Sequence, residues 1–261
     1  MKLADIMKTI EEDFPKSLAM DWDNVGLLVG DEEADIKKVL ISLDVTDAAV
    51  ERAAKEGADL ILTHHPLLFR PLKTVTEQNF IAARVRKLIR NDINYYAMHT
   101  NFDIAGMADR NALDLALLEP EVLEELGTDE YGHAYGLGRV GMLSEEMTLK
   151  ELAGHVKDVM RLDAVRVYGD PDRKVIRVGV SSGAGKSAVS DALKKQADVL
   201  ITGDLDYHTA IDANAQGLAM IDAGHYGTEF TYIPFMEEYV KEKFPELTIL
   251  TMEIVQPYQI V

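Results

Sequence analysis

Two adjacent histidines, His64 and His65, follow the largely apolar run at residues 58–62 and precede Pro66. Aliphatic residues that stop at a polar pair and a proline predict a buried strand entering a loop. Ligands of α/β proteins bind where the strands end, and two imidazoles at such a place suit a metal ion. Taken alone, the pair has an equally good second interpretation, in which one ring packs and the other faces solvent.

Two further histidines each have a carboxylate four residues later in the chain. These pairs are His99 with Asp103 and His225 with Glu229, and each histidine follows a predicted strand, at 93–98 and at 218–223. One such pair could be coincidence or a surface ion pair. Two such pairs, at matching places in the two similar halves of the chain described below, favour a common site.

The candidate ligands are therefore His64, His65, His99, Asp103, His225 and Glu229. Nitrogen and carboxylate ligands suit zinc, manganese, iron, cobalt or nickel better than magnesium. Six candidates exceed the about four positions around one zinc ion, whereas two metal ions about 4 Å apart would use them all. A carboxylate can bridge two metals, and the longer side chain of Glu229 makes it the candidate bridge.

The elements that position these residues occur twice. Residues 37–66 and 173–208 both predict a strand, a helix and a second strand that starts with Ala-Asp and ends in Thr. In each copy a further helix and strand follow, and the aliphatic runs suit buried parallel strands. The pattern predicts an α/β fold with two similar α/β domains, an internal duplication, and the metal site between them.

The boundary between the domains is expected in the acidic, glycine-containing stretch 119–131. We expect a first domain at 1–128, joined by the C-terminal segment 235–261, and a second domain at 129–234. The second domain should contain a strand at 134–142. It should also contain a helix, whose start is indicated by the capping box from Thr148 to Glu151. A helix at 229–242 and a strand at 247–252 end the chain, and spacing leaves open which sheet this strand joins.

Composition limits the function classes. The chain has 261 residues, no cysteine and a net charge of −18. Thiolate metal sites and disulfides are thereby excluded, and the acidic charge opposes nucleic acid or anionic membrane as a partner. No stretch approaches the roughly 20 apolar residues of a membrane span, and the N-terminus lacks a signal-peptide core. We therefore expect a cytoplasmic protein without a membrane partner.

Five segments occur in an order that resembles the Nif3-like family, also catalogued as GTP cyclohydrolase 1 type 2 homologues. They are WDNVGLLVG (22–30), LTHHP (62–66), HTNFD (99–103), GLGRVG (136–141) and GHYGTE (224–229). The resemblance implies a Nif3-like fold, a dinuclear metal site and a toroidal homohexamer, a trimer of dimers. It also implies that the ligands are His64, His65, Asp103, His225 and Glu229, with His99 near the site rather than a direct ligand.

The leading hypothesis is a metal-dependent hydrolase that uses two divalent metal ions per chain. The resemblance implies a nucleotide-like small molecule as substrate, with GTP as the first candidate. His99 would then be the candidate for acid or base work, and Arg139, in the glycine-rich segment, a weak candidate for phosphate binding. The alternative is a metal-stabilised ring that binds or regulates without turnover.

Three residues near these motifs have simpler expectations. Trp22 is expected to pack in the core rather than to stack on a substrate. Asp44, which ends the predicted strand 38–44, could orient a histidine or form a turn. Asp204, at the place in the second copy that corresponds to the metal loop of the first copy, is expected to be structural or to line the pocket.

Overall fold

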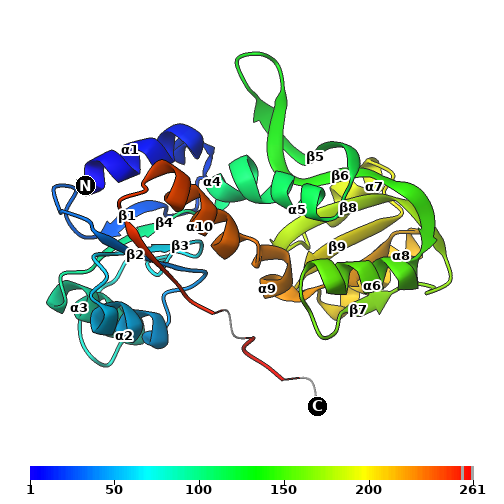
Figure 1. Cartoon of the computed structure of the whole chain (residues 1–261). Coiled ribbons are helices and arrows are strands. Elements are labelled where there is room, and N and C mark those ends of the chain that lie inside the picture. Colours follow the sequence, from blue (N-terminus) through cyan, green and yellow to red (C-terminus); the bar gives the residue numbers. More distant parts are fainter. Residues whose placement is uncertain (254–255, 260–261) are drawn as a thin grey trace. The chain divides into compact units, whose positions relative to one another are not determined.

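The computed structural model describes residues 1–253 and 256–259, and these residues form two compact units (Figure 1). Unit 1 contains Met1–Ala105 and the described residues from Tyr232 to Glu253, and unit 2 contains Gly106–Thr231 and the described residues 256–259. Each unit has its own β-sheet with helices packed against it. Among the described residues, no helix is long and apolar enough to cross a membrane.

A five-stranded sheet with the order β1–β4–β3–β2–β11 forms the centre of unit 1. The strands β4, β3, β2 and β11 run parallel, and β1 is antiparallel to β4. The strands are β1 (Gly26–Val29), β2 (Lys38–Ser42), β3 (Leu60–Thr63), β4 (Asn94–Ala97) and β11 (Thr248–Thr251). The helices are α1 (Leu3–Asp13), the 3-10 turn η1 (Lys16–Leu18), α2 (Asp47–Glu56), α3 (Phe80–Arg90), α4 (Thr100–Phe102) and α10 (Tyr232–Lys243).

Local sequence explains how β2 connects to β3. Thr46 caps α2 by accepting a hydrogen bond from the amide of Ala49, and Gly57 ends the helix in the left-handed conformation at φ 67°. The strand β3 is buried along its whole length, as parallel strands covered on both faces are. Because β2, β3 and β4 are parallel, their carboxyl ends lie at one edge of the sheet.

Unit 2 is built on a six-stranded sheet with the order β5–β6–β8–β9–β10–β7. Its strands β8, β9 and β10 are parallel, whereas β5, β6 and β7 pair antiparallel to their neighbours. The strands are β5 (Leu118–Thr128), β6 (Ala134–Thr148), β7 (Arg166–Tyr168), β8 (Lys174–Ala184), β9 (Val199–Gly203) and β10 (Ala219–Asp222). The helices are α5 (Ala108–Asp114), α6 (Leu149–Val159), α7 (Val189–Lys194), α8 (Tyr207–Ala215) and α9 (Gly224–Glu229), and the π-helical segment Asp103–Met107 precedes α5.

The α/β class and the duplicated strand–helix–strand core are confirmed. The acidic stretch expected to separate the domains is instead strand β5, which forms a hairpin with β6. Unit 2 consequently begins at Gly106 rather than at 129. The last strand, β11, pairs in parallel with β2 and so belongs to the sheet of unit 1.

The two cores also share a detail of their hydrogen bonding. In unit 1, Asp59 Oδ2 accepts from the amides of Lys37 and Lys38 at 2.8 and 2.9 Å. In unit 2, Asp198 Oδ2 accepts from the amides of Ile176 and Arg177 at 3.0 and 2.9 Å. The Ala-Asp that opens the second strand of each repeat therefore fixes the preceding strand beside it.

Candidate metal centre

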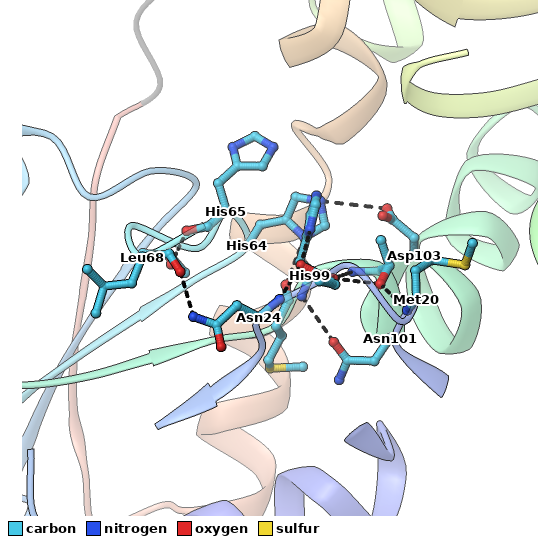
Figure 2. A network of polar contacts seen from close by, with 12 residues as sticks. Met20, Asn24, His64, His65, Leu68, His99, Asn101 and Asp103 are labelled. Atoms are coloured by element: carbon cyan, nitrogen blue, oxygen red, sulfur yellow. Dashed lines mark hydrogen bonds and ion pairs between the residues drawn. The ribbon is translucent and has the colours of Figure 1, made fainter. Parts of the chain in front are cut away.

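Three histidines of unit 1 lie together at the carboxyl edge of its sheet (Figure 2). His64 and His65 directly follow β3, and His99 follows β4. One ligand nitrogen from each lies within 4.8 Å of those of the other two, so the three could hold a metal ion. Asp103 begins the π-helical segment after α4. π-helical turns are frequent at functional sites.

His64 has its ring fixed by the backbone. Its side chain is completely buried, and Nδ1 lies 2.9 Å from the carbonyl oxygen of Met98. A carbonyl only accepts hydrogen bonds, so Nδ1 carries the proton and Nε2 presents its lone pair. That Nε2 faces Asp103 Oδ1 at 3.6 Å (Figure 2). Two acceptors facing each other need a cation, either a second proton on the imidazole or a metal ion.

His65 is held by a carboxylate in the same manner. Its Nδ1 donates to Asp44 Oδ1 at 3.0 Å, so Nε2 again presents a lone pair. Of the two roles considered for Asp44, the structure shows the one in which it orients a histidine. The sequence alone could not decide this, because the contact joins the ends of two neighbouring strands.

The loop that carries His65 is fixed by Tyr95 on β4. The Tyr95 hydroxyl donates to the His65 carbonyl at 2.9 Å and accepts from the Leu67 amide at 2.8 Å. Burial raises the pKa of Tyr95 to about 12, so the hydroxyl keeps its proton and remains a donor at neutral pH. The buried side chain of Tyr95 on β4 therefore holds the loop after β3 in its conformation.

His99 is positioned by Asp23, which lies in the loop before β1. Nδ1 of His99 donates to Asp23 Oδ1 at 2.9 Å, and Thr100 donates to Oδ2 through its amide and its hydroxyl. Burial raises the pKa of Asp23, but the hydrogen bonds from His99 and Thr100 outweigh it and lower the pKa to about 2. Asp23 is thus ionised at neutral pH and keeps the His99 proton on Nδ1. Sequence reasoning missed this role, although Asp23 lies inside the segment 22–30.

Unit 2 has a donor pair of its own on the short helix α9. His225 Nε2 lies 3.2 Å from Glu229 Oε1, and Nδ1 of the same ring donates to Asp204 Oδ2 at 2.9 Å. The carboxylate of Asp204 fixes the tautomer, so a lone pair again faces a carboxylate oxygen. Glu229 is buried, with 2% of its surface exposed. Asp204, expected to be structural or to line the pocket, orients this histidine.

A glycine makes room for the carboxylate of Glu229. Gly183 has φ 64°, and a Cβ placed on it would lie 2.7 Å from Glu229 Oε1 and 3.3 Å from the His225 ring. The left-handed backbone and the close approach both require glycine here. The end of β8 therefore supports the donor pair with its backbone.

The donor groups fit a transition metal. Imidazole nitrogens whose rings are oriented by a second hydrogen bond, together with carboxylate oxygens, are the usual surroundings of zinc, manganese, iron, cobalt or nickel. One ligand nitrogen each from His64, His65 and His99 lies within 4.8 Å of the other two, which is a spacing that could hold a metal ion.

Trp22 differs from its expected surroundings, and Arg139 proves to be buried. Trp22, expected in the core, is 56% exposed, because the loop after η1 carries it outward while fixing Asp23. Arg139 is only 8% exposed, and its guanidinium donates to Asp109 and to the carbonyl oxygens of Gly136 and Gly138. These contacts indicate that Arg139 holds β6 in place. Phosphate binding by Arg139 stays a prediction.

The repeated fold and the donors at its strand ends define a duplicated α/β protein with histidine and carboxylate clusters. The sequence profile of the Duf34/NIF3 (NGG1p interacting factor 3) family matches residues 1–257, and the chain belongs to this family. A Clostridium perfringens protein named GTP cyclohydrolase 1 type 2 homolog is 36% identical over 265 residues, covering 100% of each chain. A protein of the same name from Clostridium acetobutylicum is 35% identical, covering 96% of this chain and 94% of that one.

Solved structures agree with this assignment. The crystal structure of a Bacillus cereus protein related to NIF3 matches this chain with a TM-score of 0.91 at 28% identity. The match covers 100% of this chain and 99% of the other. The family resemblance and the Nif3-like fold expected from the five sequence segments are thereby confirmed.

Proposed function

We propose that this protein is a metal-dependent hydrolase with a dinuclear centre. The ligands would be His64, His65 and Asp103 from unit 1 and His225 and Glu229 from unit 2, holding two divalent ions. The observation that carries this proposal is the pair of opposed acceptors within each unit, His64 facing Asp103 and His225 facing Glu229. A divalent ion held by both members of each pair would satisfy both acceptors.

When bound, such a metal pair lowers the pKa of a coordinated water and polarises the centre under attack. The protein's part is to keep the donors in the correct tautomer. Met98, Asp44 and Asp204 each accept the Nδ1 proton of one histidine. With Nδ1 engaged in this way, Nε2 would be the atom of each of these histidines that binds a metal.

His99 is the candidate general base. Its Nδ1 proton is held by the ionised Asp23, so Nε2 is ready to take a proton from the attacking water. The imidazolium that results is stabilised by the same carboxylate. It can then deliver that proton to the leaving nitrogen or oxygen, which restores neutral His99 for the next turnover.

The substrate that we propose is a nucleotide such as GTP, because both clostridial relatives carry the name GTP cyclohydrolase 1 type 2 homolog. In that reaction water adds to the carbon of the purine imidazole ring, and a carbon–nitrogen bond breaks. The released nitrogen takes up the proton from His99. The homohexamer implied by the family resemblance is likewise a proposal, which light scattering after gel filtration would test.

Turnover of a nucleotide panel by zinc- or manganese-loaded protein tests this function, with products identified by mass spectrometry. Asp103→Ala should bind less metal and make no product while keeping its circular dichroism, and the exposed Asp163→Ala should behave like the parent. Ring-opened GTP from the parent alone would establish the reaction. Inertness of fully loaded parent protein toward nucleotides and phosphoesters would contradict the proposal and favour a binding or regulatory role.

A further inference from the structure

Beside the histidines of unit 1, two large aromatic side chains are exposed next to each other. Trp22 is 56% exposed and Phe69 is 46% exposed, and their ring centroids are 5.7 Å apart at an angle of 52°. Exposed apolar side chains that lie together are characteristic of binding surfaces rather than of ordinary solvated loops. Trp22 is also the only tryptophan of the chain.

The aromatic pair lies next to the candidate centre. The indole of Trp22 meets the His99 ring edge-on, with centroids 6.0 Å apart. The neighbouring Asp23 holds His99 through Nδ1, so one loop positions both the indole and the proposed base. A molecule stacked on Trp22 would therefore present its adjacent atoms to His99.

Hydrogen bonds hold the two loops of this surface in place. The side-chain amide of Asn24 donates to the carbonyl of Leu68, which ties the loop of Trp22 to the loop of Phe69 (Figure 2). The amide of Met20 donates to the Thr100 hydroxyl at 2.9 Å, which ties the first loop to α4 (Figure 2). The aromatic pair is thus preorganised, and this lowers the entropy cost of binding a ligand.

A hollow of about 380 Å³ lies between these loops, lined by residues 22–24 and 68–72. Besides aromatic and aliphatic side chains, its lining includes the amide of Asn24, one cation, Arg70, and the carboxylate of Asp23, which is buried. Among the described residues, no carboxylate forms an ion pair with Arg70, although the chain as a whole has a net charge of −18. A guanidinium with this setting suits an anionic group, with which it can form a bidentate contact.

We propose that this hollow, which we name the Trp22 shelf (residues 22–24 and 68–72), binds the heteroaromatic ring and phosphate of a nucleotide. The ring stacks on Trp22 and Phe69, and a phosphate pairs with Arg70. The assignment of a reacting nucleotide rests on the proposed hydrolase function. Binding to the shelf does not require turnover, so the two proposals can fail separately.

Fluorescence of Trp22 reports this site directly, because no other tryptophan contributes. GMP added to metal-loaded protein should quench the emission in a saturable manner, since the base stacks on the indole. Guanosine should quench but bind more weakly, because it lacks the anion. Ribose 5-phosphate should not quench. Absence of saturable quenching by GMP would overturn the proposal.

Calorimetric GMP titrations of variants identify which side chains supply the affinity. Trp22→Leu should weaken binding by about 5- to 150-fold, the range for losing one base–aromatic stack, and Trp22→Phe should restore part of it. Arg70→Gln should weaken GMP binding but not guanosine binding. The matched controls are Tyr131→Leu, an exposed aromatic of the β5–β6 hairpin, and Arg90→Gln on α3, and neither should change the affinity.

Measuring the metal content of the variants distinguishes a loss of nucleotide binding at the Trp22 shelf from a loss of metal at the candidate centre. Trp22→Leu should keep the parent metal stoichiometry, measured by elemental analysis, while losing GMP affinity. An equal GMP affinity in the parent and in Trp22→Leu would overturn the shelf even if nucleotide hydrolysis were observed. Loss of GMP affinity in Trp22→Leu without any turnover by the parent would support the shelf and contradict the hydrolase.

Discussion

Unit 1 and unit 2 have the same parallel three-strand core but distribute their donors differently over it. In unit 1 the orienting carboxylate, Asp44, follows the first core strand, and its histidine, His65, follows the second. In unit 2 the carboxylate, Asp204, follows the second core strand, and its histidine, His225, comes after the third. The same contact is displaced by one strand, so the repeated framework does not dictate where the chemistry is placed.

The strand register gives a second difference. The amide of Met98 donates to the Thr63 carbonyl, and the amide of Ala223 donates to the Thr202 carbonyl. Met98 and Ala223 are thus equivalent, and His99 corresponds to Gly224 rather than to His225. The sequence match between the two histidine–carboxylate pairs is therefore wrong by one residue. His225 lies one position further, on the helix that also carries Glu229.

The largest loss of stability is expected from replacing Gly183, which lies against the donor pair of unit 2 and has no counterpart beside the histidines of unit 1. Gly183→Ala should cost about 2–4 kcal/mol through left-handed strain and the clash with Glu229, and should also weaken metal binding. Gly57→Ala in unit 1 is the matched control. Its φ of 67° is similar, but nothing lies within 4 Å of the added Cβ. Urea unfolding and metal titration should show strain alone for Gly57→Ala, and equal metal affinity in both variants would contradict the prediction.

The two orienting carboxylates, Asp44 and Asp204, should contribute equally to metal affinity. Asp44→Ala and Asp204→Ala each remove the acceptor that fixes a histidine tautomer, and each should lower metal affinity by about 10- to 100-fold. Competition with a chromophoric chelator measures this, with Asp163→Ala as the surface control. If only one of the two variants loses affinity, the two contacts do not play corresponding roles.

Asp59 and Asp198, which occupy matching positions in the two units, allow the stability of the two strand pairs to be compared. Asp59→Ala and Asp198→Ala should each lower the free energy of unfolding by about 2 kcal/mol, because each leaves two backbone amides without their acceptor. The asparagine variants keep an acceptor oxygen and should lose less. Unequal costs in the two units, measured in urea, would show that the strand pairs are not energetically alike.

A smaller, pH-dependent effect should come from the contact between Asp23 and His99, which unit 2 lacks because Gly224 stands at the position that matches His99. The pKa of Asp23 is lowered from 3.8 to about 2 in the folded protein. Its ionised form therefore stabilises the fold above pH 3.8, and this stabilisation is lost as the pH falls through about 2. Asp23→Asn should be less stable at neutral pH and should lack this part of the acid dependence, as thermal melting from pH 2 to pH 5 would show.

Sequence patterns predicted much of the framework. Aliphatic runs indicated β2, β3, β8 and β9, because buried parallel strands need continuous apolar residues. The strands β1, β5 and β7 were missed. The strand β5 contains four glutamates and is exposed over most of its length, and this composition is hard to distinguish from an acidic linker.

Six candidate ligands could be listed from the sequence, because histidine and carboxylate side chains at strand ends are chemically distinctive, and whether they bind metal stays a prediction. Their orientation was decided only by the tertiary structure. The hydrogen bonds that fix His64, His65, His99 and His225 join each ring to a residue from a different strand end or loop. Exposure of Trp22 and burial of Arg139 depend likewise on which loops pack together. Such contacts arise from strand register and loop packing, which residue spacing along the chain does not encode.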